Sequence, residues 1–198
     1  MMEVIGLTGQ IASGKSTVSA YLRQKGFAVV DADEIAHEVI RRGGRAYAAL
    51  VRQFGTEFVG AEGEIDRRKL GQAVFADPEK LAQLNAITHP CICAEIRARL
   101  AAQRGTVFLD APLLVQAGLD TLCGEIWQVT AADDIRLGRI QVRDGLGADE
   151  ARARMQSQAG VCMPTDRLVH TIDNSSDTAA LYRQIDRLLA GRTPYENA

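Results

Sequence analysis

The sequence predicts an α/β protein in which helices flank a parallel β-sheet. Short apolar runs of strand length alternate with longer segments of helical periodicity, an alternation typical of parallel sheets. A glycine-rich turn, GQIASGKS at residues 9–16, separates the first apolar run from the first helical segment. The chain has 198 residues, which is enough to bury a full hydrophobic core. We therefore expect a single domain.

The amino-terminal elements form a strand–helix–strand unit. We expect a strand at Val4–Leu7, a helix from about Ser16 to Lys25, and a second strand at Phe27–Asp31. Gly26 should end the helix, because glycine readily adopts the left-handed conformation that follows many helix C-termini.

A mostly helical stretch follows, from about residue 33 to residue 103. Within it, residues 55–66 (GTEFVGAEGEID) are expected to form a loop. Pro78 and Pro90 are each expected to begin a helix, because a proline in the first helical turn costs no hydrogen bond.

The remaining segments again alternate between strands and helices. Residues 159–167 have no regular pattern, and the tail GRTPYENA is expected to be frayed. The last helix carries an apolar stripe on one face. The expected elements are strands at Thr106–Leu109, Ile126–Val129 and Thr171–Ile172, and helices at Asp133–Arg143, Asp149–Ser157 and Asp177–Leu189.

Composition argues against several classes of protein. The apolar fraction of 46% and charged fraction of 24% are ordinary for a globular protein, and a formal charge of -2 gives no electrostatic reason to expect a nucleic-acid partner. The sequence shows no signal peptide and no apolar run of about 18 residues that could span a membrane. The four cysteines lack metal-ligand spacing and are expected to be reduced thiols in a cytoplasmic protein.

The strongest motif is GQIASGKS, which fits the phosphate-loop pattern G-x-x-x-x-G-K-[ST] in its required place between a strand and a helix. Backbone N–H groups of such a loop surround phosphate oxygens, and the helix N-terminus adds its positive dipole. Lys15 should reach the β- and γ-phosphates, Ser16 should bind Mg²⁺, and Thr17 should lie near the α-phosphate. The alternative, a chance glycine-rich turn, is disfavoured by the strand and helix on either side. The residues expected to surround a nucleoside triphosphate are Gln10, Ile11, Ala12, Ser13, Gly14, Lys15, Ser16 and Thr17.

A phosphate loop alone does not identify a reaction, since GTPases, ATPases and kinases all use one. The chain lacks the N-K-x-D motif that reads guanine, and its length leaves little room for motor machinery. A small kinase, with a lid that excludes water from the phosphates, fits best.

A lid should carry cations to the transferring phosphoryl group. Arg139 and Arg143 lie four residues apart on an expected helix and therefore share a face, with Arg136 one turn earlier. A solvated basic helix face, paired with Asp133 or Asp144, is the other interpretation of the same spacing.

Three aspartates could take part in the chemistry. Asp110 ends the apolar strand TVFLD, where an acid could hold Mg²⁺ through water or could cap the following turn. In VVDADEIAH, Asp31 and Glu34 have the spacing of a capping box, so Asp31 should shape the strand-to-helix turn. Asp33 then lies in the first helical turn, near the carboxyl edge of the sheet where ligands bind in open α/β folds.

The chain resembles the dephospho-CoA kinase family. The resemblance is carried, in order, by GLTGQIASGKST, VVDADEIAHEV, IDRRKL, VFADP, LNAITHP, DAPLLVQAG, RLGRIQVRD and IDN, and it runs from Val4 to about Leu189. Glycines usually occupy the family positions of Gln10 and Ala12, and a glutamate usually occupies that of Gln116. The family's Ala-Asp before the last strand is missing from LVHTIDNSS.

The resemblance implies transfer of the ATP γ-phosphate to the 3′-hydroxyl of dephospho-CoA, the last step of CoA biosynthesis, with Mg²⁺ as cofactor. It implies that Asp33 orients or deprotonates the hydroxyl, and that Lys15 and Arg139 neutralise the transferring group with help from Arg143. Asn174 would lie near the adenine. The family positions on the acceptor side correspond to Asp33, Arg67, His89, Pro90 and Leu113, whereas His37 and His170 are expected to be structural.

The resemblance also divides the domain. We expect a nucleotide-binding core at residues 1–32, 104–137 and 168–198, a helical acceptor-binding insertion at about 33–103, and a lid at about 138–167. The protein is expected to be a monomer or weak homo-oligomer. Two other functions remain open: a nucleoside monophosphate kinase, which could use Arg67 and Arg68 to hold the acceptor's phosphate, and a non-catalytic ATP sensor.

Overall fold

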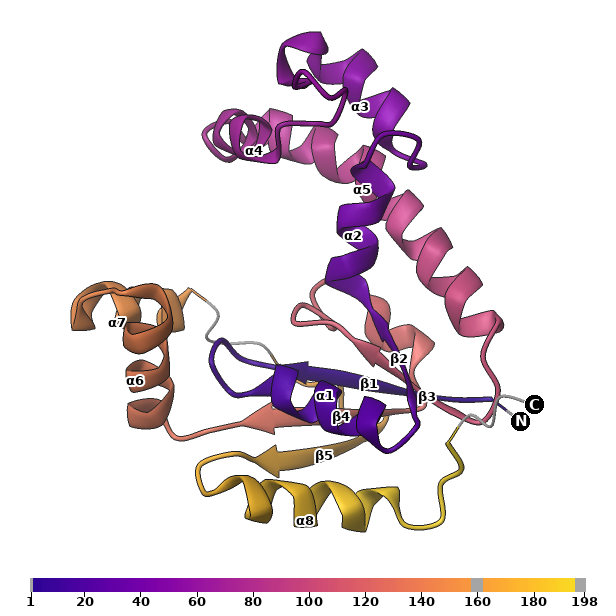
Figure 1. The fold of residues 1–198 in the computed structure, drawn as a ribbon, viewed down its shortest axis with the longest axis vertical. Coiled ribbons are helices and arrows are strands. Elements are labelled where there is room, and N and C mark those ends of the chain that lie inside the picture. The colour runs from indigo at the N-terminus through magenta and orange to yellow at the C-terminus, as the bar shows by residue number, and fades with distance from the viewer. Residues whose placement is uncertain (1, 158–161, 195–198) are drawn as a thin grey trace. The chain divides into compact units, whose positions relative to one another are not determined.

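A five-stranded sheet organises the first of two units into which the chain divides. The structure, a computed structural model, describes residues 2–157 and 162–194. The first unit comprises the residues up to Val30 and those from Ala102 onward, and the second comprises Asp31–Ala101 (Figure 1). The strands are β1 (Glu3–Gly9), β2 (Ala28–Asp31), β3 (Thr106–Asp110), β4 (Glu125–Thr130) and β5 (Leu168–Asp173).

The strand order β2-β3-β1-β4-β5 confirms the predicted parallel α/β fold. In the parallel ladders Leu7 pairs with Asp110, Gly9 with Val129, and Thr130 with Asp173. The carboxyl ends of these strands therefore reach the same edge of the sheet, which is the edge where ligands bind in open α/β folds.

Helices α1 (Lys15–Gln24) and α8 (Thr178–Leu189) pack on one face of this sheet (Figure 1). The rings of Tyr21 and Tyr182 stack between the two helices with centroids 3.7 Å apart. Gly26, at a φ of 86°, ends α1 as expected, and its N–H donates to the Arg23 carbonyl. The core of this face is formed by Ile5, Leu7, Val18, Tyr21, Leu22, Phe27, Phe108, Trp127, Val129, Ile172, Leu181, Ile185 and Leu189.

Two helices of the first unit, α6 (Asp133–Asp144) and α7 (Ala148–Gln156), follow β4 and cover most of the expected lid. Residues 158–161 lie outside the described part of the chain, and residues 162–167 form no helix or strand. The strand expected at Thr171–Ile172 is longer in the structure, because β5 pairs with β4 along its whole length.

The second unit is helical, with α2 (Ala32–Ile40), α3 (Tyr47–Phe54), α4 (Arg67–Phe75) and α5 (Pro78–Ala101). The expected loop at 55–66 includes a short 3-10 turn (Thr56–Phe58). The prediction that Pro90 begins a separate helix was wrong, because α5 continues through it. Pro90 removes one hydrogen bond from the helix, but α5 also packs against α2, α3 and α4, and this packing holds it together.

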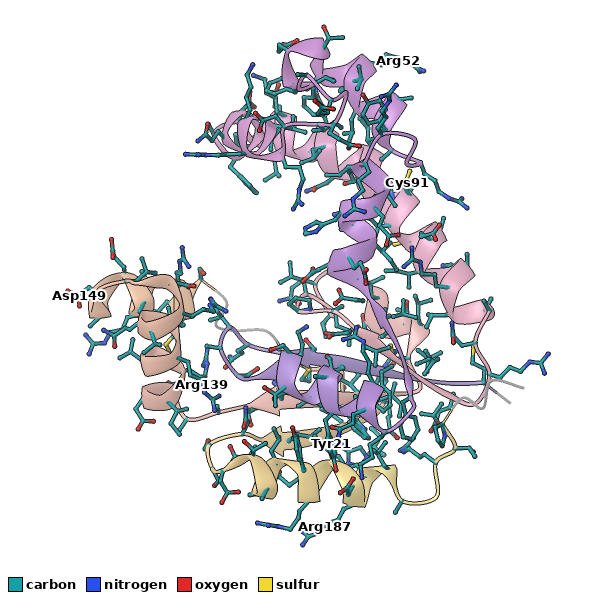
Figure 2. All side chains as sticks on the ribbon, in the orientation of Figure 1. Tyr21, Arg52, Cys91, Arg139, Asp149 and Arg187 are labelled. Carbon is teal, nitrogen blue, oxygen red and sulfur yellow. The ribbon has the colours of Figure 1, made fainter. Side chains whose placement is uncertain are left out.

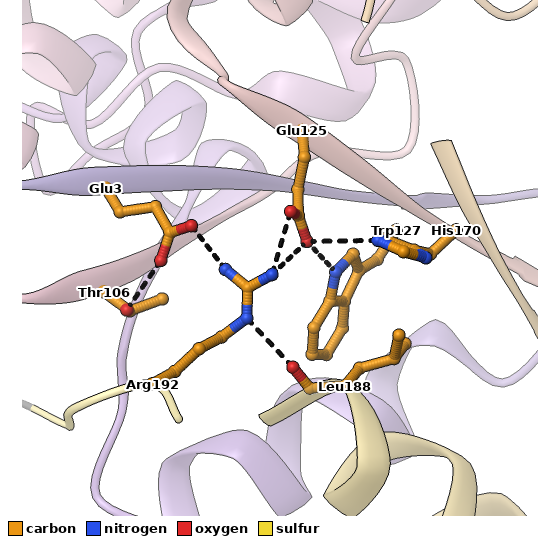
Figure 3. Close-up of polar contacts among 7 residues, drawn as sticks. All are labelled: Glu3, Thr106, Glu125, Trp127, His170, Leu188 and Arg192. Atoms are coloured by element: carbon orange, nitrogen blue, oxygen red, sulfur yellow. Dashed lines mark hydrogen bonds and ion pairs between the residues drawn. The ribbon is translucent and has the colours of Figure 1, made fainter. Parts of the chain in front are cut away.

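Of the tail GRTPYENA, residues 191–194 are anchored rather than frayed, and residues 195–198 lie outside the described part of the chain. Arg192 lies among carboxylates at the amino edge of the sheet: Nη1 donates to Glu3, and Nη2 donates to both oxygens of Glu125 at 2.8 Å (Figure 3). Its guanidinium also lies 5.9 Å from the ring centroid of Trp127. Burial disfavours the charged guanidinium, but the hydrogen bonds to Glu125 and Glu3 outweigh burial and raise the pKa of Arg192. Sequence reasoning missed this contact because its partners lie far apart along the chain.

The cysteines Cys91, Cys93, Cys123 and Cys162 are free thiols. Burial raises the pKa of the Cys123 thiol to about 12, which keeps it protonated at neutral pH. Among the helices of the described residues, none combines the length and the apolar character that a membrane crossing requires.

Replacing Arg192 with methionine should destabilise the first unit. The carboxylate of Glu125, whose side chain is only 11% exposed, would lose its cation, so we expect the free energy of unfolding to fall by about 3 kcal/mol. Urea denaturation followed by circular dichroism measures this change. The matched control is Arg187→Met on the outer side of α8, which should change stability by less than about 0.5 kcal/mol (Figure 2). Equal effects of the two substitutions would show that the contacts of Arg192 contribute nothing.

Candidate active site

The glycine-rich loop joins β1 to α1 at the carboxyl edge of the sheet. The Ser13 N–H donates to the Gln10 carbonyl at 3.0 Å, and Gly14 precedes the helix with a φ of 93°. Gly9 is needed because a Cβ there would lie 2.6 Å from the Ser13 hydroxyl. These contacts give the loop the strand–loop–helix geometry that the motif predicts.

Side chains from outside the loop hold its carbonyl groups. Arg139 Nη1 donates to the carbonyls of Ala12 at 3.1 Å and Ser13 at 3.3 Å, and Asn174 Nδ2 donates to the Ser13 carbonyl at 2.8 Å. Arg139 points from α6 toward the loop (Figure 2), and its Nη2 donates to the Asn174 carbonyl at 3.0 Å. In a trans peptide the N–H points away from the C=O. The contacts that hold the carbonyls therefore direct the N–H groups of the same peptides to the opposite side of the loop.

Arg136 holds a third carbonyl of the same loop. Its Nε donates to the Ile11 carbonyl at 3.0 Å, and its Nη1 donates to Asp133 at 3.0 Å. The residue is only 4% exposed. Arg136 was seen in the sequence as part of the basic helix face but was not assigned to the site. Its spacing of three residues from Arg139 places both arginines on one side of α6, which is the signal that could have identified it.

Lys15 forms an ion pair with Asp110, whose second carboxylate oxygen accepts a hydrogen bond from the Ser19 hydroxyl. Asp110 is 3% exposed at the end of β3. The sequence analysis missed Ser19, although it lies four residues after Lys15 and therefore on the same face of α1. The Asp110 carboxylate thus contacts Lys15 and Ser19 at the start of α1. These contacts support a role beside the phosphate loop rather than as a cap of the following turn.

Ser16 and Asp110 are the residues expected to hold a metal. Ser16 lies exposed in the first turn of α1, and both side chains offer oxygen donors of the kind that Mg²⁺ prefers. Within residues 2–157 and 162–194, no group of three or more histidine, cysteine or acidic side chains could hold a metal ion. The donors therefore fit a metal that takes most of its ligands from phosphates and water.

The structure does not bring Arg143 to the loop. Nε and Nη2 of Arg143 donate to the Asp144 carboxylate, at 2.8 and 2.9 Å, and Arg154 of α7 donates to the same group at 2.7 Å. The hydrogen bonds from Arg143 hold the pKa of Asp144 below its usual value. Arg143 thus follows the alternative interpretation, a surface ion pair, whereas Arg139 contacts the loop.

Two hollows open beside the start of the loop. One has a volume of about 480 Å³ and lies between the loop and helices α6 and α7, with Gln10, Leu137 and Met155 in its wall. The other is much smaller and brings Leu113 and Gln116 next to Gln10. Leu113, expected on the acceptor side, is 51% exposed there.

The other acceptor residues belong to the second unit. Asp31 Oδ1 accepts hydrogen bonds from the N–H groups of Asp33 at 2.9 Å and Glu34 at 3.1 Å, which confirms that Asp31 caps α2. The side chain of Asp33 is exposed in the first turn of α2. One turn later, His37 Nε2 lies 2.5 Å from Nη2 of Arg67. His37 therefore contacts a residue that is expected to bind the acceptor substrate.

His89 and Pro90 are neighbours in the middle of α5, and both are exposed. Within the second unit, Arg67 thus contacts His37, and His89 and Pro90 lie together on the exposed side of α5.

Together with the parallel sheet, the loop places the protein among the phosphate-loop nucleotide-binding proteins. Within that class it belongs to the dephospho-CoA kinase family, because the model of that family matches residues 3–180 of the chain.

Similar proteins and structures agree with this assignment. The dephospho-CoA kinase of Carboxydothermus hydrogenoformans is 41% identical over 197 residues, covering 96% of this chain and 94% of its own. That of Anaeromyxobacter dehalogenans is 44% identical over 193 residues, covering 96% and 92%. The solved structure of the dephospho-CoA kinase from Campylobacter jejuni is 26% identical, has a TM-score of 0.71 and covers 96% of both chains. The resemblance in the sequence motifs is thus confirmed at the level of the family.

Replacing Gly14 with alanine should damage the loop. The new Cβ would lie 2.0 Å from Asn174 Nδ2, and a φ of 93° is one that side chains rarely adopt. We expect ATP binding, measured by isothermal titration calorimetry, to weaken at least about tenfold. Gly138→Ala on α6 is the control, because a Cβ there meets nothing within 4 Å, and it should bind ATP normally. Normal ATP binding by Gly14→Ala would show that the loop tolerates a different conformation.

Proposed function

We propose that the protein transfers the γ-phosphate of ATP to the 3′-hydroxyl of dephospho-CoA, giving CoA and ADP. The observation that carries this proposal is membership of the dephospho-CoA kinase family over residues 3–180, with the phosphate loop intact. The free cysteines support a cytoplasmic enzyme, and we expect a monomer or weak homo-oligomer.

On the nucleotide side, Lys15 and Arg139 neutralise charge as the phosphoryl group moves. The transition state is loose and spreads charge over the phosphoryl oxygens, so fixed cations nearby stabilise it. Lys15 leaves Asp110 for the phosphates when ATP binds, and Arg139 already lies against the loop. Arg143 reaches the nucleotide after it exchanges Asp144 for a phosphate, because its Nε and Nη2 both bond to the Asp144 carboxylate. Asn174 borders the adenine.

Mg²⁺, when bound, neutralises the phosphates and holds them in line for transfer. Ser16 would bind it through the hydroxyl, and Asp110 would bind it through water. Release of Lys15 from Asp110 would free the carboxylate for this role, so the same exchange serves both the lysine and the metal site.

On the acceptor side, Asp33 accepts a hydrogen bond from the 3′-hydroxyl and orients it. A ribose hydroxyl ionises far above neutral pH, and its proton leaves late in a loose transition state, so positioning contributes more than basicity. Asp33 is suited to this because its backbone is fixed by the Asp31 cap while its carboxylate is exposed. Arg67, His89, Pro90 and Leu113 contact the rest of the acceptor.

The reaction is tested by offering three acceptors side by side: dephospho-CoA, AMP and adenosine. We expect ADP formation with dephospho-CoA to exceed that with AMP by at least about a hundredfold in kcat/KM. Transfer to AMP without transfer to dephospho-CoA would indicate a nucleoside monophosphate kinase. ATP binding without transfer to any acceptor would indicate a sensor.

Replacing Asp33 with alanine should abolish transfer and leave ATP binding intact. Loss of the positioned carboxylate should lower kcat about 10²- to 10⁴-fold, because the hydroxyl is no longer oriented. The dissociation constant for ATP should stay within about threefold of wild type. Glu34→Ala, which removes the neighbouring exposed acid, is the control and should keep most of the activity. An Asp33→Ala variant with near-normal turnover would refute the role of Asp33.

A further inference from the structure

Residues 10–13 of the phosphate loop form a turn that its sequence disfavours. The Ser13 N–H closes the turn on the Gln10 carbonyl at 3.0 Å, so Ile11 and Ala12 are its central residues. Ala12 has a φ of 60°, and among the described residues it is the only non-glycine residue with positive φ. Ile11 has no positive φ, and positive φ at the second central position alone is that of a type II turn, which normally needs glycine or asparagine there. Alanine by itself favours a type I turn.

The two turn types differ in the peptide that joins the central residues. Between them, ψ of the first central residue changes by about 150° and φ of the second by about 170°. The peptide between Ile11 and Ala12 therefore turns over, and the Ile11 carbonyl changes sides. The Ala12 N–H points opposite to this carbonyl and changes sides with it.

Arg136 contacts this peptide through the Ile11 carbonyl. Of the side chains that donate to the loop carbonyls, Arg139 and Asn174 bond to Ala12 and Ser13, whereas Arg136 Nε bonds to Ile11 at 3.0 Å. The guanidinium is fixed, because it is buried and its Nη1 is paired with Asp133.

The cost of burying Arg136 also points to a specific role. Its Nη2 is buried without a hydrogen-bond partner within the described part of the chain. A buried donor without an acceptor is unfavourable, so an apolar side chain of similar length would serve packing better. The contact with Ile11 gives a reason for an arginine at this position.

We propose that Arg136 is a positioning residue that fixes the Ile11–Ala12 peptide in its type II orientation. This directs the Ala12 N–H toward the side of the loop that receives the nucleotide's phosphates. The proposal rests on the nucleotide-binding role of the loop, and it does not depend on which acceptor the enzyme uses. Glycine at position 12 would favour the same turn without help, so Arg136 and Ala12 should act as a coupled pair.

A double-mutant cycle tests this coupling. Dissociation constants for Mg–ATP, and for tripolyphosphate as a probe without the nucleoside, are measured by calorimetry in the absence of any acceptor. R136M should weaken binding of both ligands about tenfold. A12G serves as the reference for the double mutant, and R136M/A12G should bind within about threefold of A12G.

The controls separate positioning from charge. R183M, which removes an exposed arginine of α8, should not change either constant. If Arg136 acted only by its charge, R136M would weaken binding equally with and without A12G, and that result would overturn the proposal. So would unchanged binding by R136M.

A second variant keeps the test valid if R136M does not fold. D133A removes the ion-pair partner of Arg136, and Asp133 has a side chain that is 84% exposed, so the fold should tolerate the change. We expect D133A to weaken binding about twofold to threefold, and A12G to restore it. Weaker binding by D133A that A12G does not restore would contradict the proposal. Because no acceptor is present, these constants are unaffected if transfer to dephospho-CoA fails.

Discussion

A backbone loop can bind an anion only if its carbonyl oxygens are directed elsewhere. Each peptide carries a donor and an acceptor that point in opposite directions, so presenting N–H groups to a phosphate means finding partners for the carbonyls. In this protein the partners come from α6 and from the end of β5, in the form of Arg136, Arg139 and Asn174. The loop depends on these distant elements, and they depend on the sheet register that brings the strand ends to one edge.

Local features of the sequence predicted local structure well. The phosphate-loop motif located β1, the loop and α1, because its glycines and its lysine have fixed geometric roles. Asp31 was identified as a helix cap from a spacing of three residues, and the structure confirms its hydrogen bonds. In both cases the physics that sets the conformation acts within a few neighbouring residues.

Contacts between distant residues were not predictable in the same way. The pairing of Lys15 with Asp110 joins the start of α1 to the end of β3, and its existence depends on the order of strands in the sheet. Pro90 was misjudged because packing along α5 outweighs a local helix-breaking tendency. Arg143 shares a helix face with Arg139, but the neighbouring Asp144 decides its partner. Side-chain spacing identifies the candidates, and the tertiary surroundings decide between them.

The anchoring of Arg192 has a consequence for the synthesis of the chain. Strand β1 lies in the centre of the sheet, yet its neighbour β4 is synthesised much later. Glu3, at the start of β1, can pair with Arg192 only when the chain is nearly complete. Contacts between residues so far apart in sequence form slowly, because the ends of a long loop must first meet. Strand β1, which pairs with β3 and β4, also emerges from the ribosome long before either partner strand. The second unit, whose residues are continuous from Asp31 to Ala101, has all its own contacts available earlier. A nascent chain can order the helical unit first and complete the nucleotide-binding sheet only when translation has passed Arg192.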